Sequence, residues 1–212
     1  MKTLLAGYQR FRANGWPKQK KAFESLAKGQ SPKALVLSCV DSRVDPAMIF
    51  DSAPGEVLTV RNVANLVPPY APDALHHATS AALEFGVRVL EVKHIMVLGH
   101  GSCGGVRALL EGAPANAREF VAPWMSIAEP ARARAVLETS PEKRQQVCER
   151  EVVGISLANL MTFPWIAERV ESGQLQLHGA WFAIYTGELL IRQPDGTFVP
   201  PAIKSDTRHA TF

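Results

Sequence analysis

Two thiols, an imidazole and a carboxylate–arginine pair stand at two distant points of this chain, and together they predict a catalytic metal. Cys39, Asp41 and Arg43 lie in one short run, whereas His100 and Cys103 lie three residues apart much later in the chain. Two Cys and one His are suitable ligands for Zn²⁺ and leave its fourth tetrahedral position free. Because water can be acidified at a free position, this ligand set is typical of a catalytic zinc. Asp41 is the only nearby candidate for that position, and Arg43 could hold it away from the metal.

The three cysteines fit other uses less well than a metal site. An uneven count without a signal peptide does not indicate a framework of disulfides. A phosphatase loop needs Cys-x5-Arg, whereas Cys39–Arg43 and Cys103–Arg107 are both Cys-x3-Arg. Cys148 lies in a charged helical stretch and is expected to be a small buried side chain. A redox protein that oxidises Cys39 with Cys103 stays an alternative, and metal analysis separates it from a zinc protein.

The glycines around His100 could instead bind a phosphate, because they follow a predicted strand and open a predicted helix. Gly99, Gly101 and Gly104 have the spacing of G-x-G-x-x-G, but the match is weak. No acidic residue on a clear second strand completes a dinucleotide site. The loop also lacks the Lys and Ser/Thr of a P-loop. We therefore interpret the glycines as allowing close backbone approach to a metal, with amide N–H groups free for an anion.

Composition predicts one globular domain. The 212 residues, 47% of them hydrophobic and 20% charged, suffice for one core, so we expect a single domain over 1–212 with residues 1–30 as an N-terminal helical arm. A net charge of +3 without a long basic run argues against a nucleic-acid partner. No apolar stretch approaches the roughly 20 residues that span a bilayer, so no membrane partner is expected. The N-terminus lacks the apolar core of a signal peptide, which favours a cytoplasmic location.

Alternating strands and helices predict an α/β fold with a central, mainly parallel β-sheet that helices flank. The last residues predict an antiparallel C-terminal edge hairpin around Pro194-Asp195-Gly196. In the arm, Asn14-Gly15 is expected to end a first helix before a second one begins. The expected strands cover 34–37, 57–60, 94–98, 175–184, 188–192 and 197–199; the expected helices cover 2–13, 17–28, 73–90, a segment from about 106, and most of 115–173, with breaks near Pro123, Pro130, Pro141 and Pro164.

Three motifs resemble those of the β-class carbonic anhydrases, in the order in which that family carries them. They are Cys39-x-Asp41-Ser42-Arg43, Arg61-Asn62-Val63-Ala64-Asn65 and Gly99-His100-x-x-Cys103-Gly104-Gly105. The resemblance implies one zinc per subunit, bound by Cys39, His100 and Cys103. It implies that Asp41, paired with Arg43, accepts a hydrogen bond from the attacking water, or closes the site as a fourth ligand. It also implies a tight homodimer, or a higher homo-oligomer, with active sites at the subunit interface.

The activity that the resemblance implies is the reversible hydration of carbon dioxide to bicarbonate and a proton by a zinc lyase, carbonate dehydratase. Leu58, Val63 and Phe85 are the expected apolar wall of the substrate pocket. Gln30 and the Gly104 amide are expected to polarise substrate oxygens. Leu58 and Phe85 stand where the family usually has Phe and Tyr, so we expect turnover and inhibitor preference to differ.

Within the family, Gln30 matches the plant-like group rather than the group that a second bicarbonate inhibits. The resemblance resumes at His178-Gly179. The inhibited group has a Trp three residues before the first Cys and a Tyr three residues after this later His-Gly pair. Here those positions hold Val36 and Phe182, and only Arg61 remains of that set. We therefore expect the inhibitory site to be absent or badly impaired.

Two alternatives to carbon dioxide hydration stay open at this point. The same site could hydrolyse carbon disulfide or carbonyl sulfide, which a direct assay with each substrate decides. A zinc-binding or sensory module with an inactive Asp41–Arg43 pair would instead bind zinc without hydrating carbon dioxide.

Overall fold

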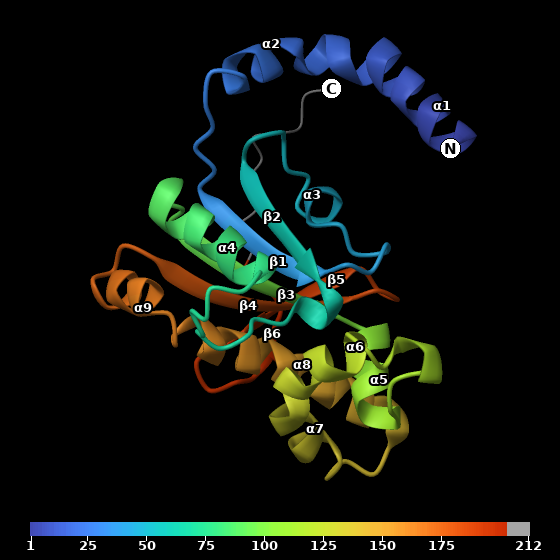
Figure 1. The fold of residues 1–212 in the computed structure, drawn as a ribbon. Helices are drawn as coiled ribbons and strands as arrows, with labels where there is room; N and C mark the ends of the chain where they lie inside the picture. Colours follow the sequence, from blue (N-terminus) through green and yellow to red (C-terminus); the bar gives the residue numbers. More distant parts are fainter. Residues whose placement is uncertain (203–212) are drawn as a thin grey trace.

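Among the described residues, six strands form one sheet, in the order β2-β1-β3-β4-β5-β6 (Figure 1). The computed structural model describes residues 1–202 of the chain. β1 pairs in parallel with β2 and β3, and β3 with β4, whereas β5 and β6 are antiparallel. The predicted α/β fold, with its antiparallel C-terminal hairpin, is confirmed. The strands are β1 (Ala34–Cys39), β2 (Val57–Asn62), β3 (His94–His100), β4 (Gln176–Ala183), β5 (Glu188–Arg192) and β6 (Phe198–Val199).

The central strands place two of the predicted ligands at the same edge of the sheet. Residues 35–37, Leu-Val-Leu, are almost completely buried, as expected for a strand covered on both faces. β1 and β3 run in parallel, with Ser38 opposite Leu98. Parallel strands end at one edge of a sheet, which is where sites form in α/β folds. Cys39, the last residue of β1, and His100, the last residue of β3, therefore lie close together.

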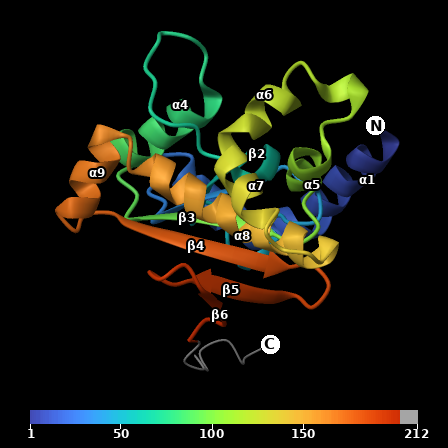
Figure 2. The ribbon, with the colours of Figure 1, turned by 90° about the horizontal axis from the view of Figure 1, so that it is seen from below.

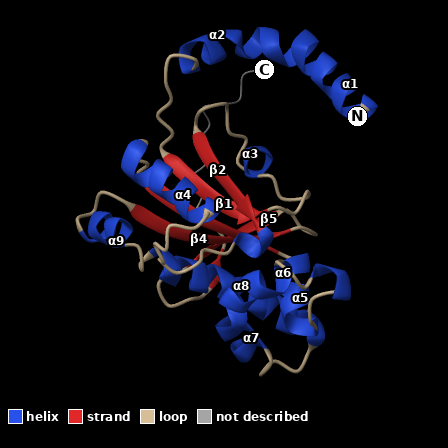
Figure 3. Ribbon diagram, viewed as in Figure 1, coloured by secondary structure: helices blue, strands red, loops and turns tan. Residues whose placement is uncertain are grey.

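Figure 2 shows α8 and α9 on one side of β4, and Figure 3 shows the short helix α3 beside β2. α8 packs against β3 and β4 on one face, and Ile49 of α3 packs against Val36 of β1 on the other. Among the described residues, no helix is both long and apolar enough to cross a bilayer. The helices are α1 (Lys2–Arg10), α2 (Trp16–Leu26), α3 (Pro46–Ile49), α4 (Ala78–Glu84), α5 (Gly104–Glu111), α6 (Val121–Met125), α7 (Glu129–Ala135), α8 (Pro141–Leu160) and α9 (Pro164–Glu171).

Proline marks several helix starts, as the sequence predicted. Pro141 and Pro164 are the first residues of α8 and α9, where the missing N–H costs nothing. The Ser140 hydroxyl accepts a bond from the Lys143 amide and caps α8. Pro123 does not break a helix, because it lies in the first turn of α6.

The N-terminal arm is one continuous, curved helical rod that extends away from the sheet (Figure 1). α1 runs into α2 through a π-helical turn at 11–15. The predicted break at Asn14-Gly15 is wrong, because Gly15 keeps helical dihedrals (φ −82°, ψ −51°). The Phe11 and Trp16 rings also pack edge to face across the turn, 6.3 Å apart. No side chain of α1, α2 or this turn is buried.

The helix predicted from residue 73 begins later, at Ala78. The five residues before it form a turn, in which Ala74 has a positive φ of 62° that a helix cannot contain. Asp73 stabilises this turn, since its carboxylate accepts the Leu75 amide and contacts the His77 ring at 2.6 Å. Aspartate competes with helix formation in this way through local bonds to the backbone.

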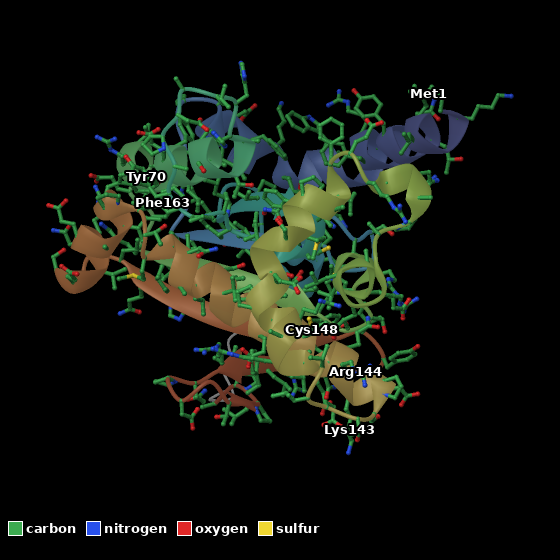
Figure 4. All side chains as sticks on the ribbon, turned by 60° about the horizontal axis from the view of Figure 1, so that its bottom comes forward. Met1, Tyr70, Lys143, Arg144, Cys148 and Phe163 are labelled. Carbon is green, nitrogen blue, oxygen red and sulfur yellow. The ribbon has the colours of Figure 1, made fainter. Side chains whose placement is uncertain are left out.

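The third cysteine lies on α8, in the apolar core. Cys148 is fully buried and belongs to the same apolar cluster as Cys39, Cys103 and Val44. Figure 4 labels Cys148 on α8, far from Met1 at the free end of the arm. The expectation of a small buried side chain at this position is confirmed.

A histidine pair joins β3 and β4 at the end of the sheet opposite the predicted ligands. His94 Nδ1 lies 3.2 Å from His178 Nε2, and both rings are partly buried. Burial lowers the pKa of His178, and the nearby charge of His94 lowers it further. The folded protein therefore resists protonation of this ring more than the unfolded chain does.

This pair predicts a loss of stability in acid. Below about pH 6.5 the unfolded chain binds the His178 proton more readily, so stability falls as the pH falls. The melting temperature of the wild type should drop more between about pH 7.5 and 5.5 than that of His178→Gln. Circular dichroism melts at both pH values check this. An equal drop in the two proteins contradicts it, since other acid-sensitive groups are common to both.

Candidate metal centre

The three predicted ligands converge. Cys39 ends β1, His100 ends β3, and Cys103 is the N-cap of α5. The two sulfurs lie 4.0 Å apart, and all three ligating atoms lie within 4.8 Å of one another. A tetrahedral zinc, with bonds of about 2.0 to 2.3 Å, holds its ligand atoms roughly 3.3 to 3.8 Å apart, so small shifts complete this site.

The chemistry of these atoms fits a cation. His100 Nδ1 donates to the Gly101 carbonyl at 2.9 Å, which leaves the lone pair on Nε2. That Nε2 is buried and has no hydrogen-bond partner among the described residues. The Cys103 thiol, by donating to the Cys39 sulfur, lowers the pKa of Cys39 to about 4 although burial opposes this. An orphaned imidazole nitrogen beside a thiolate is what Zn²⁺ binds, so the residues present fit the metal.

Asp41 is held by Arg43 in a two-pronged pair. Arg43 Nε donates to Oδ1 at 2.9 Å, and Nη2 donates to Oδ2 at 2.7 Å. The Arg43 amide also donates to Oδ1 at 3.0 Å. The hydrogen bonds from Arg43 lower the pKa of Asp41 well below its usual range, so the carboxylate is ionised.

This carboxylate sits beside the three ligands rather than among them. Asp41 Oδ2 lies 4.0 Å from His100 Nε2. Asp41 is not one of the three residues whose ligating atoms all lie within 4.8 Å of one another. Arg43 Nη2 also donates to the Ser102 carbonyl at 3.1 Å, which ties the pair to the loop before Cys103.

Arg61 holds the chain segment that carries Cys39 and Asp41, a role that the sequence did not reveal. Its Nε donates to the Cys39 carbonyl at 2.9 Å and its Nη2 to the Asp41 carbonyl at 2.6 Å. Its Nη1 contacts the Asp45 carboxylate at 3.1 Å. The only signal was its place in the second motif, which does not say what it contacts.

The turn after β2 supports the Cys39 sulfur. The Ala64 amide donates to Cys39 Sγ at 3.3 Å. Ala64 and Asn65 both have positive φ values, 60° and 48°, which cost of order 1 to 3 kcal/mol each where the surroundings impose them. Trp124 Nε1 and the Ser156 hydroxyl donate to carbonyls of this turn, at 2.8 and 2.9 Å, and hold it in place.

Two of the predicted substrate residues adjoin the centre. Val63, at the turn after β2, packs against Gly105, where a Cβ atom would lie only 2.8 Å from its Cγ1. Gly104 is the first residue of α5 and faces open space. Its amide is one of the free N–H groups at a helix start.

The other three predicted substrate residues lie elsewhere. Gln30 is exposed and precedes β1, so the full length of that strand separates it from Cys39. Leu58 lies near the start of β2, opposite Leu35, and Phe85 follows α4 and is exposed. A strand rises about 3.3 Å per residue, which puts these side chains of one copy far from its own metal centre.

A largely apolar hollow of about 710 Å³ opens beside the centre. Val40, Asn62 and Val63 belong to the metal-binding end of the sheet, and the far wall comes from the 76–80 and 119–127 segments. The lining residues are Val40, Asn62, Val63, Pro68, His76, His77, Ala78, Thr79, Ser80, Glu119, Phe120, Val121, Pro123, Trp124 and Ile127.

Comparisons with known proteins agree with this geometry. The family described as "Carbonic anhydrase" matches residues 34–189. "Beta carbonic anhydrase 3" of Arabidopsis thaliana is 37% identical over 193 residues, which cover 88% of this chain and 74% of the relative. The solved β-carbonic anhydrase CcaA aligns with a TM-score of 0.89 and 33% identity, covering 95% of this chain and 99% of the other. Two tetrameric β-carbonic anhydrases of Sordaria macrospora were also solved; the match has a TM-score of 0.79 and 27% identity, covering 89% and 94%.

The fold and the Cys-His-Cys centre define a zinc-dependent α/β enzyme. The chain belongs to the carbonic anhydrase family, in its β class. Its reaction is the reversible hydration of carbon dioxide to bicarbonate and a proton, with zinc as the cofactor.

Zinc content tests the ligand set. Cys103→Ser should reduce bound zinc from one per chain to less than about a tenth, because a hydroxyl does not replace a thiolate ligand. Cys148→Ser is the matched control: it also places a hydroxyl in the core, at a cost of about 1 to 3 kcal/mol, but should keep its zinc. Metal analysis of the dialysed proteins measures both. A Cys103→Ser protein with a full complement of zinc would show that the ligands lie elsewhere.

Proposed function

We propose that this chain hydrates carbon dioxide at the Cys39–His100–Cys103 centre, with Asp41 and Arg43 controlling the fourth position of the metal. The main support is the two-pronged Arg43–Asp41 pair beside the orphaned His100 Nε2. When bound, zinc supplies water with a pKa of about 7, which is the nucleophile that hydration needs near neutral pH.

Asp41 provides the acceptor that orients this water. An ionised carboxylate accepts hydrogen bonds and cannot donate them, so it fixes one proton of the nucleophile and leaves the lone pair for the carbon of carbon dioxide. The distance of 4.0 Å between Asp41 Oδ2 and His100 Nε2 supports this role.

Arg43 keeps that acceptor in place. Its two side-chain bonds to Asp41 occupy both carboxylate oxygens, which favours an open metal position over a closed one. A bidentate arginine gives geometric control that a single charge does not.

The start of α5 is suited to the negative charge that develops as bicarbonate forms. Gly104 offers a free amide at the positive end of the helix dipole, in open space. Val63 contributes the adjoining apolar wall. These two residues belong to the same copy as the metal.

Gln30, Leu58 and Phe85 belong, in our proposal, to the pocket of a second copy. Their distance from the metal centre of their own chain supports this assignment, because within one copy they cannot contact the substrate. A two-fold dimer would place the same surface of each copy against the other and so complete two pockets at once.

The N-terminal arm supports assembly as well. Leu4 and Tyr8 are 74% and 59% exposed, and no described segment covers them. An exposed apolar face of this kind marks an interaction surface. The Sordaria macrospora relatives are tetrameric by their description, so we propose a homodimer or a larger even-numbered assembly.

We also propose that a second bicarbonate does not inhibit this enzyme. Each of the three nitrogens of Arg61 already donates to a group of this segment, namely the Cys39 and Asp41 carbonyls and the Asp45 carboxylate, so an anion would have to compete with these contacts. Val36 and Phe182 add no polar group at that place. Hydration rates that are independent of added bicarbonate, apart from product inhibition, would support this.

Arg43→Ala is the central test of the mechanism. Without its partner, Asp41 should move to the metal and close the site, which lowers the hydration rate by about 10- to 100-fold while zinc content stays unchanged. Stopped-flow hydration assays and metal analysis measure this. Arg107→Ala, at an exposed arginine one turn into α5, is the control and should stay near wild type. Wild-type hydration by Arg43→Ala would exclude the gating role.

Subunit mixing tests the shared pocket. Cys39→Ser and Gln30→Ala subunits are co-expressed with different tags, and mixed dimers are purified through both tags. One of the two sites in each mixed dimer then has an intact metal and an intact wall, so about half of the wild-type rate should return. Cys39→Ser mixed with His100→Ala is the control and should stay inactive, since both changes damage the metal half. No gain over the Gln30→Ala dimer would contradict a pocket built from two copies.

A further inference from the structure

A carboxylate that the proposed mechanism does not use lies behind the metal centre. Glu149, on α8, is only 3% exposed. Its Oε1 accepts the backbone N–H of Cys103 at 3.0 Å, and its Oε2 accepts Trp181 Nε1 at 3.3 Å. A buried carboxylate is costly unless donors surround it, so its presence here needs an explanation.

A second side chain of α8 completes the contact with Cys103. Gln145, one turn before Glu149, donates from Nε2 to Glu149 Oε1 at 2.9 Å and to the Cys103 carbonyl at 3.4 Å. Residues four apart lie on the same face of a helix. α8 therefore binds both the N–H and the C=O of one metal ligand.

The loop that carries Cys103 needs such support. It joins the end of β3 to the start of α5, and Ser102 within it has a positive φ of 56°. Cys103 is the N-cap of α5, so the helix does not use its N–H group. Among the described residues, Glu149 is the acceptor for that group.

α8 is also fixed close to the strand that carries the histidine ligand. A Cβ atom at Gly99 would lie 2.7 Å from Val153 Cγ2 and 3.5 Å from the Glu149 carbonyl. β3 and α8 therefore touch through a glycine, directly before His100. A carboxylate mounted on α8 can set the position of Cys103 relative to His100 with little freedom.

We propose that Glu149 is a positioning residue of the zinc site, which fixes the Cys103 sulfur relative to Cys39 and His100 through the Cys103 backbone. It acts through Cys103 and does not touch the metal or the substrate. The proposal rests on the zinc site of the proposed function and adds a residue to it. Partners that orient metal ligands typically contribute 10- to 100-fold in metal affinity.

Glu149→Ala and Glu149→Gln test this, with Glu142→Gln on the exposed first turn of the same helix as the control. Zinc affinity is measured by competition with a coloured chelator, and the absorption spectrum of the cobalt-substituted protein reports the geometry of the ligands. Glu149→Ala should lose about 10- to 100-fold in zinc affinity and change its cobalt spectrum. Glu149→Gln keeps an oxygen for the Cys103 N–H and should recover much of both. Glu142→Gln should match the wild type.

Other results overturn the proposal. If folded Glu149→Ala binds zinc within about twofold of the wild type, with an unchanged cobalt spectrum, Glu149 only stabilises the core around Trp181. If Glu149→Ala does not fold, Glu149→Gln decides the question. A Glu149→Gln protein whose zinc affinity and cobalt spectrum are as altered as those of Cys103→Ser would exclude positioning through the N–H bond that Glu149 accepts. If the wild type itself binds no zinc, the proposed metal site is wrong. That result is distinct from a failure of the Glu149 proposal, in which the wild type binds zinc and Glu149→Ala does so equally well.

Discussion

The metal centre depends on the parallel pairing of β1 with β3. That pairing places the last residues of both strands, Cys39 and His100, at the same edge of the sheet. A slip of one residue would move every side chain of a strand to the opposite face, so the ligands meet in one register only. Leu35 and Leu37 of β1 are fully buried in the apolar core, so the core holds in place the strand that ends at Cys39.

Charge is concentrated near this edge, and two arginines organise it. Arg43 binds the Asp41 carboxylate. Arg61 binds the backbone carbonyls of Cys39 and Asp41, on the segment where the chain leaves β1. The first arginine controls a reactive group and the second controls the shape of the segment that carries it. Because guanidinium donors are planar and fixed in number, neither arginine can take over the other's contacts without giving up its own.

The sequence could predict the ligands because they follow predictable strands, and the strands were predictable because each is a short apolar run. It failed at two helix boundaries that local contacts set. Asn14-Gly15 does not end a helix, and the helix assigned from residue 73 starts at Ala78. Glu149 was missed for a different reason, a long-range contact: it stands in a charged stretch typical of a solvated helix face, and only the folded chain places it under Cys103.

In the proposed two-copy pocket, each chain supplies a whole set of metal ligands but only part of the substrate pocket. Every group that holds or orients the metal ligands, from the Ala64 amide to Glu149, comes from the same copy. Gln30 and Phe85 are exposed and are not among the residues that contact the metal ligands. Metal binding therefore depends on the stability of a single folded chain. The substrate pocket depends instead on contacts between two chains. Under the proposed two-copy pocket, weakening the assembly should remove turnover and leave the zinc in place.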